Sequence, residues 1–279
     1  MVKASASDVS ELLVALPMYD LPQLQKHNDV FWTAVAQRLI EAGLSNVPAR
    51  LHRSDSPLLD LWRAPGLLLA QTCGYPLMKV LQENVQLVAT PKYLAEGCQG
   101  AYHRSAIVVR RDDEAKALMD LRGRRCAVNE MSSNSGMNLL RGKIAPLSNG
   151  VSFFSSVLTT GSHLTSLRAV ADNIADVAAI DCVTLAHLKR YFPDLVSAVR
   201  VIEWTDESPG LPFITAEGTD ESTIAAIRTA LFSTLLDENL TETRQNLLLD
   251  GFEILPLQAY QKIDAIEQQS IAFNYSQLK

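Results

Sequence analysis

The sequence predicts an α/β protein in which mostly parallel sheets are flanked by helices. Short runs of apolar residues alternate along the chain with segments whose apolar residues recur at helical spacing. Strands that are apolar throughout are buried on both faces, which is typical of parallel sheets covered by helices. The chain has 279 residues, 47% of them hydrophobic and 20% charged, which is enough for one large domain or two modest ones.

Most of the apolar runs are followed directly by a polar residue or a proline, which indicates that a strand ends there. The runs that we interpret as strands are residues 12–16, 67–70, 85–89, 107–109, 126–128, 177–180, 199–205 and 213–215. The amphipathic segments between and after them predict helices at residues 30–39, 75–82, 114–121, 136–143, 164–171, 183–191, 221–236, 240–249 and 257–266. The apolar face of the first helix is formed by Val30, Phe31, Ala34, Val35 and Leu39. Gly43 follows this helix and favours its termination.

The charge pattern argues against nucleic acid as a partner. The net charge is −6, and the basic residues between Arg104 and Arg125 are interleaved with acidic ones, so no basic stripe forms. No apolar run approaches the roughly 20 residues that span a bilayer. The segment Met1–Asp8 has no apolar signal-peptide core. We therefore expect a periplasmic protein if an export signal was removed, and a cytoplasmic protein otherwise.

The four cysteines show no spacing typical of a metal site, so we expect neither a metal nor a cofactor. Cys126 and Cys182 lie in or beside apolar strands and are interpreted as buried thiols. Cys73 and Cys98 each lie beside a glycine in a predicted loop. A disulfide between these two is sterically possible in an oxidising compartment.

Residues 131–138 form a serine-rich turn between a predicted strand and a predicted helix. Free N–H groups at a helix N-terminus favour negative charge, and hydroxyls and Gly136 let an oxyanion approach the main chain closely. A plain N-cap is the alternative interpretation of the same turn. A second turn of this kind, residues 159–163, again leads into an amphipathic helix and favours an anion site.

Ligands of open α/β sheets bind beyond the carboxyl ends of the strands. In this chain the residues at those ends are rich in neutral hydrogen-bond donors. They are residues 17–20, 71–74, 90–91, 102–105, 132–136, 162–163 and 181. A single Ser or Thr at such a place is often only a cap or a turn residue.

Several of these segments together resemble the phosphate, phosphite and phosphonate substrate-binding proteins of bacterial ABC importers. The segments are Gln71–Pro76, Tyr102–Ser105, Ser133–Gly136, Gly161–His163 with Ser166 and Val170, and Ala175–Asp181. The resemblance runs in order from about Leu12 to near the C-terminus. It implies a two-lobed type II periplasmic binding protein fold, in which two hinge crossovers join the lobes. Asn129–Ser132 lacks the Asp-Pro-Asn expected of close phosphonate binders, which indicates a divergent branch.

The resemblance also implies how the chain divides between the lobes. Lobe one would comprise residues 1–104 and 206–279, and lobe two residues 105–205. The helices after residue 220 would then pack back on lobe one. The implied partners are a small oxyanion and the membrane subunits of an ABC importer, and we expect a monomer or a weak dimer.

The family's binding turn transfers to this chain by matching positions. It implies that the ligand's oxygens are held by Ser133, Asn134, Ser135, Gly136 and the N–H group of Met137.

Other ligand-facing positions are implied at the strand ends. They are Tyr19, Thr72, Tyr102, Ser105, His163 and Asp181. For His163 the alternative is a capping or core role, because a neutral imidazole also caps helices. Asp181 would meet an ammonium group of the ligand, or would simply cap the next helix. Trp62 is interpreted as a core residue.

The function that we expect is capture of a phosphonate-like or phosphate-like oxyanion by lobe closure, without catalysis. One alternative is a cytosolic sensor, or a binding protein for another small organic ligand. Another is a hydrolase that uses Ser135, His163 and Asp181 as a triad. The chain has no Gly-x-Ser-x-Gly elbow, and Ser135 lies among other hydroxyls, so binding is favoured over an activated nucleophile.

Overall fold

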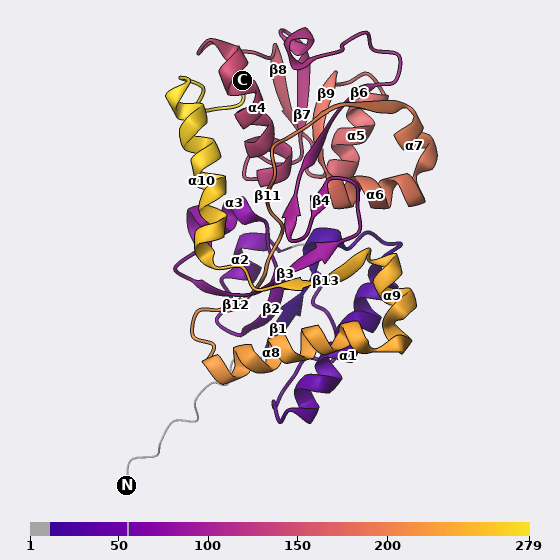
Figure 1. Ribbon diagram of the computed structural model, residues 1–279, viewed down its shortest axis with the longest axis vertical. Coiled ribbons are helices and arrows are strands. Elements are labelled where there is room, and N and C mark those ends of the chain that lie inside the picture. The colour runs from indigo at the N-terminus through magenta and orange to yellow at the C-terminus, as the bar shows by residue number, and fades with distance from the viewer. Residues whose placement is uncertain (1–11, 55) are drawn as a thin grey trace.

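The computed structural model describes residues 12–54 and 56–279, which form two lobes stacked along the long axis of the molecule (Figure 1). Each lobe is built on its own five-stranded sheet with helices against it. The α/β prediction is therefore confirmed. Met1–Asp8 lies outside the described residues, so the structure does not bear on our expectation about a signal peptide there.

The sheet of the first lobe has the strand order β1-β2-β12-β3-β13. The bounds of these strands are Leu13–Ala15, Leu67–Gln71, Phe213–Ala216, Val85–Tyr93 and Leu249–Glu253. β1 and β2 pair parallel, whereas β12 pairs antiparallel with both β2 and β3, and β13 pairs antiparallel with β3. Thus β1, β2 and β3 run in one direction, and the two strands from the C-terminal part of the chain run against them.

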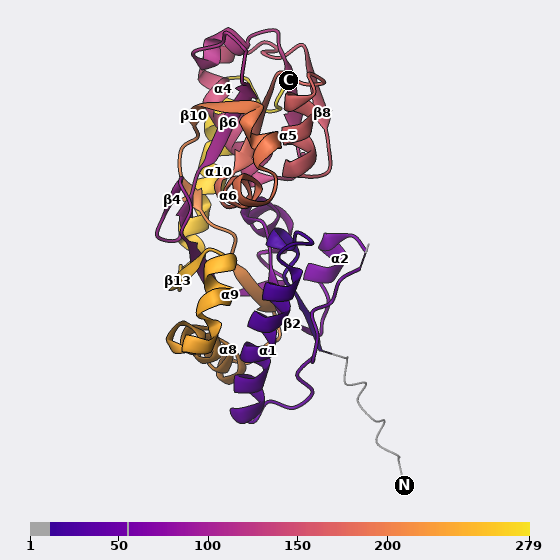
Figure 2. The same cartoon turned by 90° about the vertical axis from the view of Figure 1, so that its right-hand side faces the viewer.

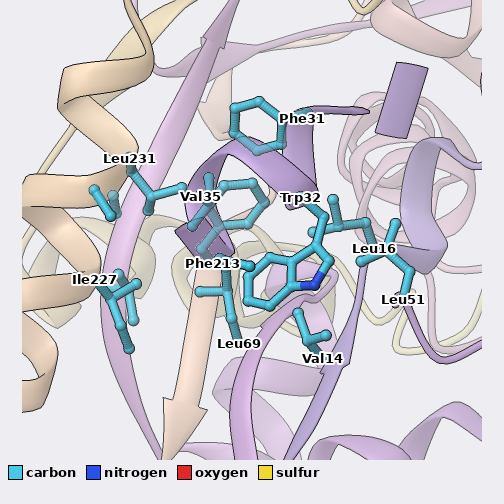
Figure 3. Close-up of a cluster of buried hydrophobic side chains, with 14 of the residues drawn as sticks. Val14, Leu16, Phe31, Trp32, Val35, Leu51, Leu69, Phe213, Ile227 and Leu231 are labelled. Carbon is cyan, nitrogen blue, oxygen red and sulfur yellow. The ribbon is translucent and has the colours of Figure 1, made fainter. Parts of the chain in front are cut away.

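Helices cover both faces of this first sheet. They are α1 (Gln25–Glu41), α2 (Leu58–Trp62), α3 (Gly74–Pro76), α8 (Glu221–Ser233) and α9 (Thr241–Asn246), with shorter turns at Pro17–Tyr19, Leu77–Leu81, Thr234–Leu236 and Glu238–Leu240. The main core lies where α1 and α8 pack against the strands (Figure 3). Phe31, Trp32 and Val35 of α1 meet Phe213 of β12 and Ile227 of α8 there, and all are nearly or fully buried. Val30, which we assigned to this apolar face, is 38% exposed.

The sheet of the second lobe has the strand order β10-β6-β9-β7-β8. The bounds of these strands are Val199–Trp204, Ser105–Arg110, Val177–Asp181, Arg125–Val128 and Ser156–Thr159. β7 pairs parallel with β8 and β9, and β6 pairs antiparallel with β9 and β10. The helical segments are η3 (Leu118–Leu121), η4 (Asn134–Asn138), α4 (Leu139–Ser148), α5 (His163–Ala171), α6 (Cys182–Tyr191) and α7 (Pro193–Ser197).

A small third sheet lies between the lobes and contains the chain crossovers. Its strands are β4 (Cys98–Gln99), β5 (Tyr102–His103) and β11 (Ser208–Pro209), in the order β11-β5-β4. Just beyond it the two crossing segments are bonded to each other, since Ser105 N donates to Thr205 Oγ1 and Thr205 N donates to Ser105 O. The division of the chain at residues 104 and 206 remains our proposal.

The last helix, α10 (Leu257–Ala272), contacts both lobes. Figure 1 shows it running along one side of the molecule from the first lobe to the second, and Figure 2 shows the elongated shape from the side. Tyr260 and Ile263 belong to an apolar cluster of the first lobe, whereas Tyr275 and Leu278 after the helix lie in the core of the second. We had expected this helix to pack on the first lobe alone.

Other expectations about elements were wrong, two of them in the second lobe. The segment 114–121 is helical only at η3, because the Asp113 and Asp120 carboxylates accept hydrogen bonds from the N–H groups of Ala115, Lys116 and Ala117. β8 was not predicted at all. It is an edge strand in which Leu158 is 43% exposed, so it has no continuous apolar run.

Candidate functional site

The serine-rich turn joins β7 to η4 and α4 in the second lobe. Ser133 caps the helical segment, because its Oγ accepts a hydrogen bond from Gly136 N at 3.0 Å. Ser135 Oγ instead lies 2.9 Å from Nε2 of His163, the first residue of α5. The turn thus caps the helical segment that follows it. Through Ser135 it also contacts the second predicted turn, residues 159–163. Its π-helical form, with Asn138 N bonded to Ser133 O, is a geometry common at functional sites.

Gly136 is required by packing at this turn. A Cβ atom at this position would lie 1.8 Å from Asn129 Oδ1 and 3.2 Å from His163 Cε1. The glycine thus lets the end of β7, the serine turn and the start of α5 meet closely. Met137 follows it and is buried in the core of the second lobe.

His163 is neutral at neutral pH, because burial lowers the pKa of its ring. Ser162, not His163, caps α5 by accepting a hydrogen bond from Thr165 N. Within the described ranges, His163 Nδ1 has no hydrogen-bond partner. Asp181 uses Oδ1 to accept from Thr184 N at 2.8 Å and does not bond to His163. The imagined hydrolase triad is therefore not assembled.

Asn134 connects the serine turn to the first lobe. Its main-chain N donates to Cys73 Sγ at 3.4 Å, and its Nδ2 donates to Ser208 Oγ at 2.8 Å. Thr72 precedes Cys73 at the end of β2, is fully buried and donates its hydroxyl to Cys73 O. Ser133 and Asn134 are each 5% exposed, so the first lobe closes over the turn in this structure.

A second set of polar side chains is buried at the same junction, on the strands and helices beside the crossovers. In the part of the chain that the structure describes, the atoms of this set that lack a hydrogen-bond partner are Tyr19 Oη, His103 Nδ1 and Nε2, Ser105 Oγ, Asp181 Oδ2, and both ring nitrogens of His187. Buried polar groups are normally paired, so each of these unpaired atoms calls for an explanation such as a bound water, ion or ligand.

Asp181 ends β9 and also caps α6 through Oδ1. Its Oδ2 lies 4.0 Å from His103 Nδ1, and the side chain is almost fully buried. Across the junction, the Tyr19 ring packs edge-on against Tyr93 and lies 6.4 Å from the His187 ring. Burial, with the Asp181 charge nearby, raises the pKa of Tyr19, so its hydroxyl remains a donor.

Tyr102, the remaining predicted ligand-facing position, and Trp62, which we interpreted as a core residue, have separate surroundings. Tyr102 is half-buried on β5, and the Lys262 ammonium group lies 5.8 Å from its ring centroid. Trp62 is a core residue, as we expected, and its indole donates to Gln71 O.

The cysteines are arranged differently from our expectation of a Cys73–Cys98 disulfide. All four lie within the described residues and none forms a disulfide. Cys98 Sγ lies 3.4 Å from Cys182 Sγ, whereas Cys73 accepts a hydrogen bond from Asn134 N. The sequence did not point to the Cys98–Cys182 pair, because the two residues are far apart in the chain and only the lobe junction brings them together.

The Cys98–Cys182 pair has unequal acidities. The hydrogen bond with Cys182 lowers the pKa of Cys98 to about 6, and the neighbouring His103 ring acts in the same direction. The pKa of Cys182 is raised by the same hydrogen bond and by burial. Of the two thiols, Cys98 is therefore the one whose ionisation the surroundings favour.

Comparison with protein families identifies the chain. Residues 15–260 match the model of the family described as ABC transporter, phosphonate, periplasmic substrate-binding protein. The chain belongs to this family. The resemblance found in the sequence is confirmed, and the family is one of substrate-binding proteins rather than enzymes.

Solved structures confirm the two-lobed type II periplasmic binding protein fold. A binding protein component of an ABC phosphonate transporter from Pseudomonas aeruginosa is 16% identical, with a TM-score of 0.77 over 95% of this chain and 88% of that one. PhnD1 from Prochlorococcus marinus, in complex with methylphosphonate, is 15% identical, with a TM-score of 0.73 over 93% and 98%. A Xanthomonas citri protein bound to ATP is 18% identical, with a TM-score of 0.69 over 95% and 98%.

None of the curated protein sequences compared with the chain matches it. Within residues 12–54 and 56–279, no helix is both long enough and apolar enough to cross a bilayer.

Proposed function

We propose that this periplasmic substrate-binding protein captures a small phosphonate at the junction between its lobes and delivers it to an ABC importer. The observation that carries the proposal is the convergence of Ser135, His163 and the start of η4 at one point facing the first lobe. Membership of the family supports the importer role, and PhnD1 bound to methylphosphonate supports the ligand class.

The chemistry of this point suits an oxyanion. The Ser135 hydroxyl, the neutral His163 ring and the main-chain N–H groups of Ser135 and Met137 at the start of η4 are the donors available for a phosphonate, because the N–H groups of Asn134 and Gly136 are bonded within the protein. Hydrogen bonds to a charged group contribute roughly 1.5–3 kcal/mol each. A few of them suffice for micromolar affinity after the cost of association.

The same arrangement sets the orientation of the ligand. Asp181 carries a negative charge and keeps Oδ2 unpaired in the described structure, so the phosphonyl group would avoid it. We infer that the phosphonyl oxygens bind at Ser135 and His163, while the organic part of the ligand faces Asp181, Ser105 and Tyr19. An ammonium group on that part would pair with Asp181.

Capture would proceed by lobe closure. In this structure the Asn134 bonds to Cys73 and Ser208 join the serine turn to the first lobe and to the crossover strand β11, and a ligand that bridges the same gap would favour this closed state. No bond of the ligand is made or broken.

The test is Ser135→Ala, with Ser132→Ala as its matched control. Ser132 is an exposed hydroxyl three residues away in the same turn. Calorimetric titration with methylphosphonate, aminoethylphosphonate, phosphate and sulfate should give measurable affinity for a phosphonate in the wild type. Loss of one charge-assisted hydrogen bond in Ser135→Ala should weaken this affinity by roughly 10–100-fold. Ser132→Ala should bind like the wild type. Equal binding by both variants, or no binding of any of these anions by the wild type, would refute the proposal.

A further inference from the structure

Three potential metal ligands meet beside the lobe crossovers, and we call Cys98, His103 and Cys182 the thiol cluster. Their ligand atoms all lie within 4.8 Å of one another. The two sulfur atoms are 3.4 Å apart. Two thiols and one imidazole at this separation form a donor set of the kind that binds zinc.

The fold builds this cluster from two separate parts. Cys98 and His103 are directly opposite each other on β4 and β5. Both therefore come from the small third sheet between the lobes, which we call the hinge sheet. Cys182 is the first residue of α6 in the second lobe, and its N–H group donates to Arg104 O. Gly97 permits the close approach of the two parts, because a Cβ atom there would lie 2.9 Å from Cys182 Cβ.

In the described part of the chain, the polar atoms in and beside the cluster have few hydrogen-bond partners. His103 is 4% exposed, and neither of its ring nitrogens has a hydrogen-bond partner among residues 12–54 and 56–279. Asp181 Oδ2, 4.0 Å from His103 Nδ1, is also unpaired and adds a negative charge beside the cluster. A half-buried thiol and a buried one, next to an unsatisfied imidazole and a carboxylate, favour a bound cation, which would pair with both sulfurs and one imidazole nitrogen beside the carboxylate charge.

The dimensions agree with tetrahedral coordination. Zn–S bonds of about 2.3 Å place two thiolate sulfurs roughly 3.8 Å apart. The observed sulfur separation of 3.4 Å needs a change of only a few tenths of an ångström. A path for the ion exists as well, because Cys98 lines a surface cavity of about 410 Å³ together with residues 92–96, Gly100 and Asp250.

We propose that Cys98, His103 and Cys182 bind one Zn²⁺ ion at the hinge, leaving one coordination position open towards the surface cavity. The ion joins the hinge sheet to the start of α6. Metal occupancy therefore restricts the movement of the second lobe relative to the crossovers. None of the three proposed metal ligands is among the residues that we assign to the phosphonate, although Asp181 borders both sites.

The experiment uses the full chain, free of any affinity tag, reduced and stripped of metal with a chelator. Titration with Co²⁺ as a spectroscopic probe should give a sulfur-to-cobalt charge-transfer band and the intense visible bands of tetrahedral cobalt, saturating at one equivalent. Competition with a zinc indicator then gives the Zn²⁺ affinity. Cys98→Ser and Cys182→Ser should each weaken it by at least about 100-fold. Cys126→Ala removes a buried thiol in the core of the second lobe, outside both the cluster and the lobe contacts, and should leave it unchanged.

Protection from alkylation provides a second readout on the wild type alone. Zn²⁺ should slow the reaction of Cys98 with iodoacetamide while leaving that of Cys73 unaffected. The proposal is overturned if the reduced wild-type protein shows no sulfur-to-cobalt band, or if folded Cys98→Ser and Cys182→Ser bind Zn²⁺ like the wild type. A Cys98–Cys182 disulfide that persists in the reduced, metal-treated protein would also overturn it, because disulfide sulfurs are not thiolate ligands.

Discussion

Gly136 is the residue on which the serine turn depends most directly. Asn129 Oδ1 occupies the place where a Cβ atom would be, and the His163 ring lies on the same side. Sequence reasoning assigned Gly136 to ligand approach, and the structure adds a packing role. Local motifs identified the turn because the hydroxyls and the glycine are consecutive. Contacts with Asn129 and Cys73 depend on how β7 and the first lobe are placed, and no local pattern carries that information.

Gly136→Ala is expected to lower the free energy of unfolding by about 1–3 kcal/mol, because the methyl group must displace Asn129. Gly218→Ala is the matched control. A Cβ atom at Gly218 meets no atom within 4 Å, so its effect should stay within about 0.5 kcal/mol. Urea denaturation of both variants checks this. Similar stabilities for the two variants would contradict the packing role of Gly136.

Helix α10 and the residues after it attach the C-terminal end of the chain to the second lobe. The buried Arg141 guanidinium of α4 bonds to Glu267 of α10 at 3.1 Å and to Ser276 O at 2.6 Å. Beyond the helix, the Tyr275 ring is fully buried in the core of the second lobe. Lys279 O accepts hydrogen bonds from the N–H groups of Phe153 and Phe154. The end of the chain thus forms part of the second lobe, although the sequence analysis assigned residues 206–279 to the first lobe.

Tyr275→Ala is expected to destabilise the protein by about 3–5 kcal/mol, as truncation of a buried aromatic side chain does. Phe273→Ala removes a ring that is 48% exposed two residues earlier, and should cost less than about 1 kcal/mol. Chemical denaturation followed by fluorescence and circular dichroism compares the two. If the two variants are equally stable, the tail does not contribute to the core of the second lobe.

Periodicity identified most of the elements that have a buried apolar face, but it missed the buried strand β13 as well as the exposed strand β8. The strands from 67–70 to 213–215 are apolar runs, interrupted only at a few positions such as Gln86, Arg200 and Glu203, and appear in the structure at nearly the predicted residues. β8 is absent from the prediction because an edge strand with exposed side chains has no such run. The helix predicted at 114–121 fails because aspartate side chains satisfy the main-chain N–H groups locally, which a count of apolar positions does not detect.

A buried histidine at the junction between the lobes contributes to the pH dependence of the stability of the whole molecule. His187 of α6 is 1% exposed and faces Tyr19 of the first lobe. Burial lowers the pKa of His187 to about 4. In the unfolded chain an imidazole has a pKa of about 6.5. The unfolded state therefore binds more protons between these two values, and the free energy of unfolding falls as the pH falls through this window.

The expected loss from His187 is about 2 kcal/mol between pH 7 and pH 5. The pKa of His163 is also lowered, so this residue adds to the loss in the same direction. His187→Gln keeps a neutral polar side chain and should remove the His187 part of the pH dependence. Urea denaturation of metal-free protein at the two pH values measures it. Identical pH dependence in the wild type and His187→Gln would contradict a buried neutral ring.

The amino-acid sequence alone was sufficient for the α/β class, the family resemblance and the serine turn, because each of these is expressed in consecutive residues or in a regular spacing. The thiol cluster, the Asn134 contacts with the first lobe and the attachment of Tyr275 to the second lobe became visible only in three dimensions. Each of them joins segments that are distant in the chain. Such contacts depend on the path of the crossovers and on how the two lobes meet, and these are set by packing rather than by any local pattern.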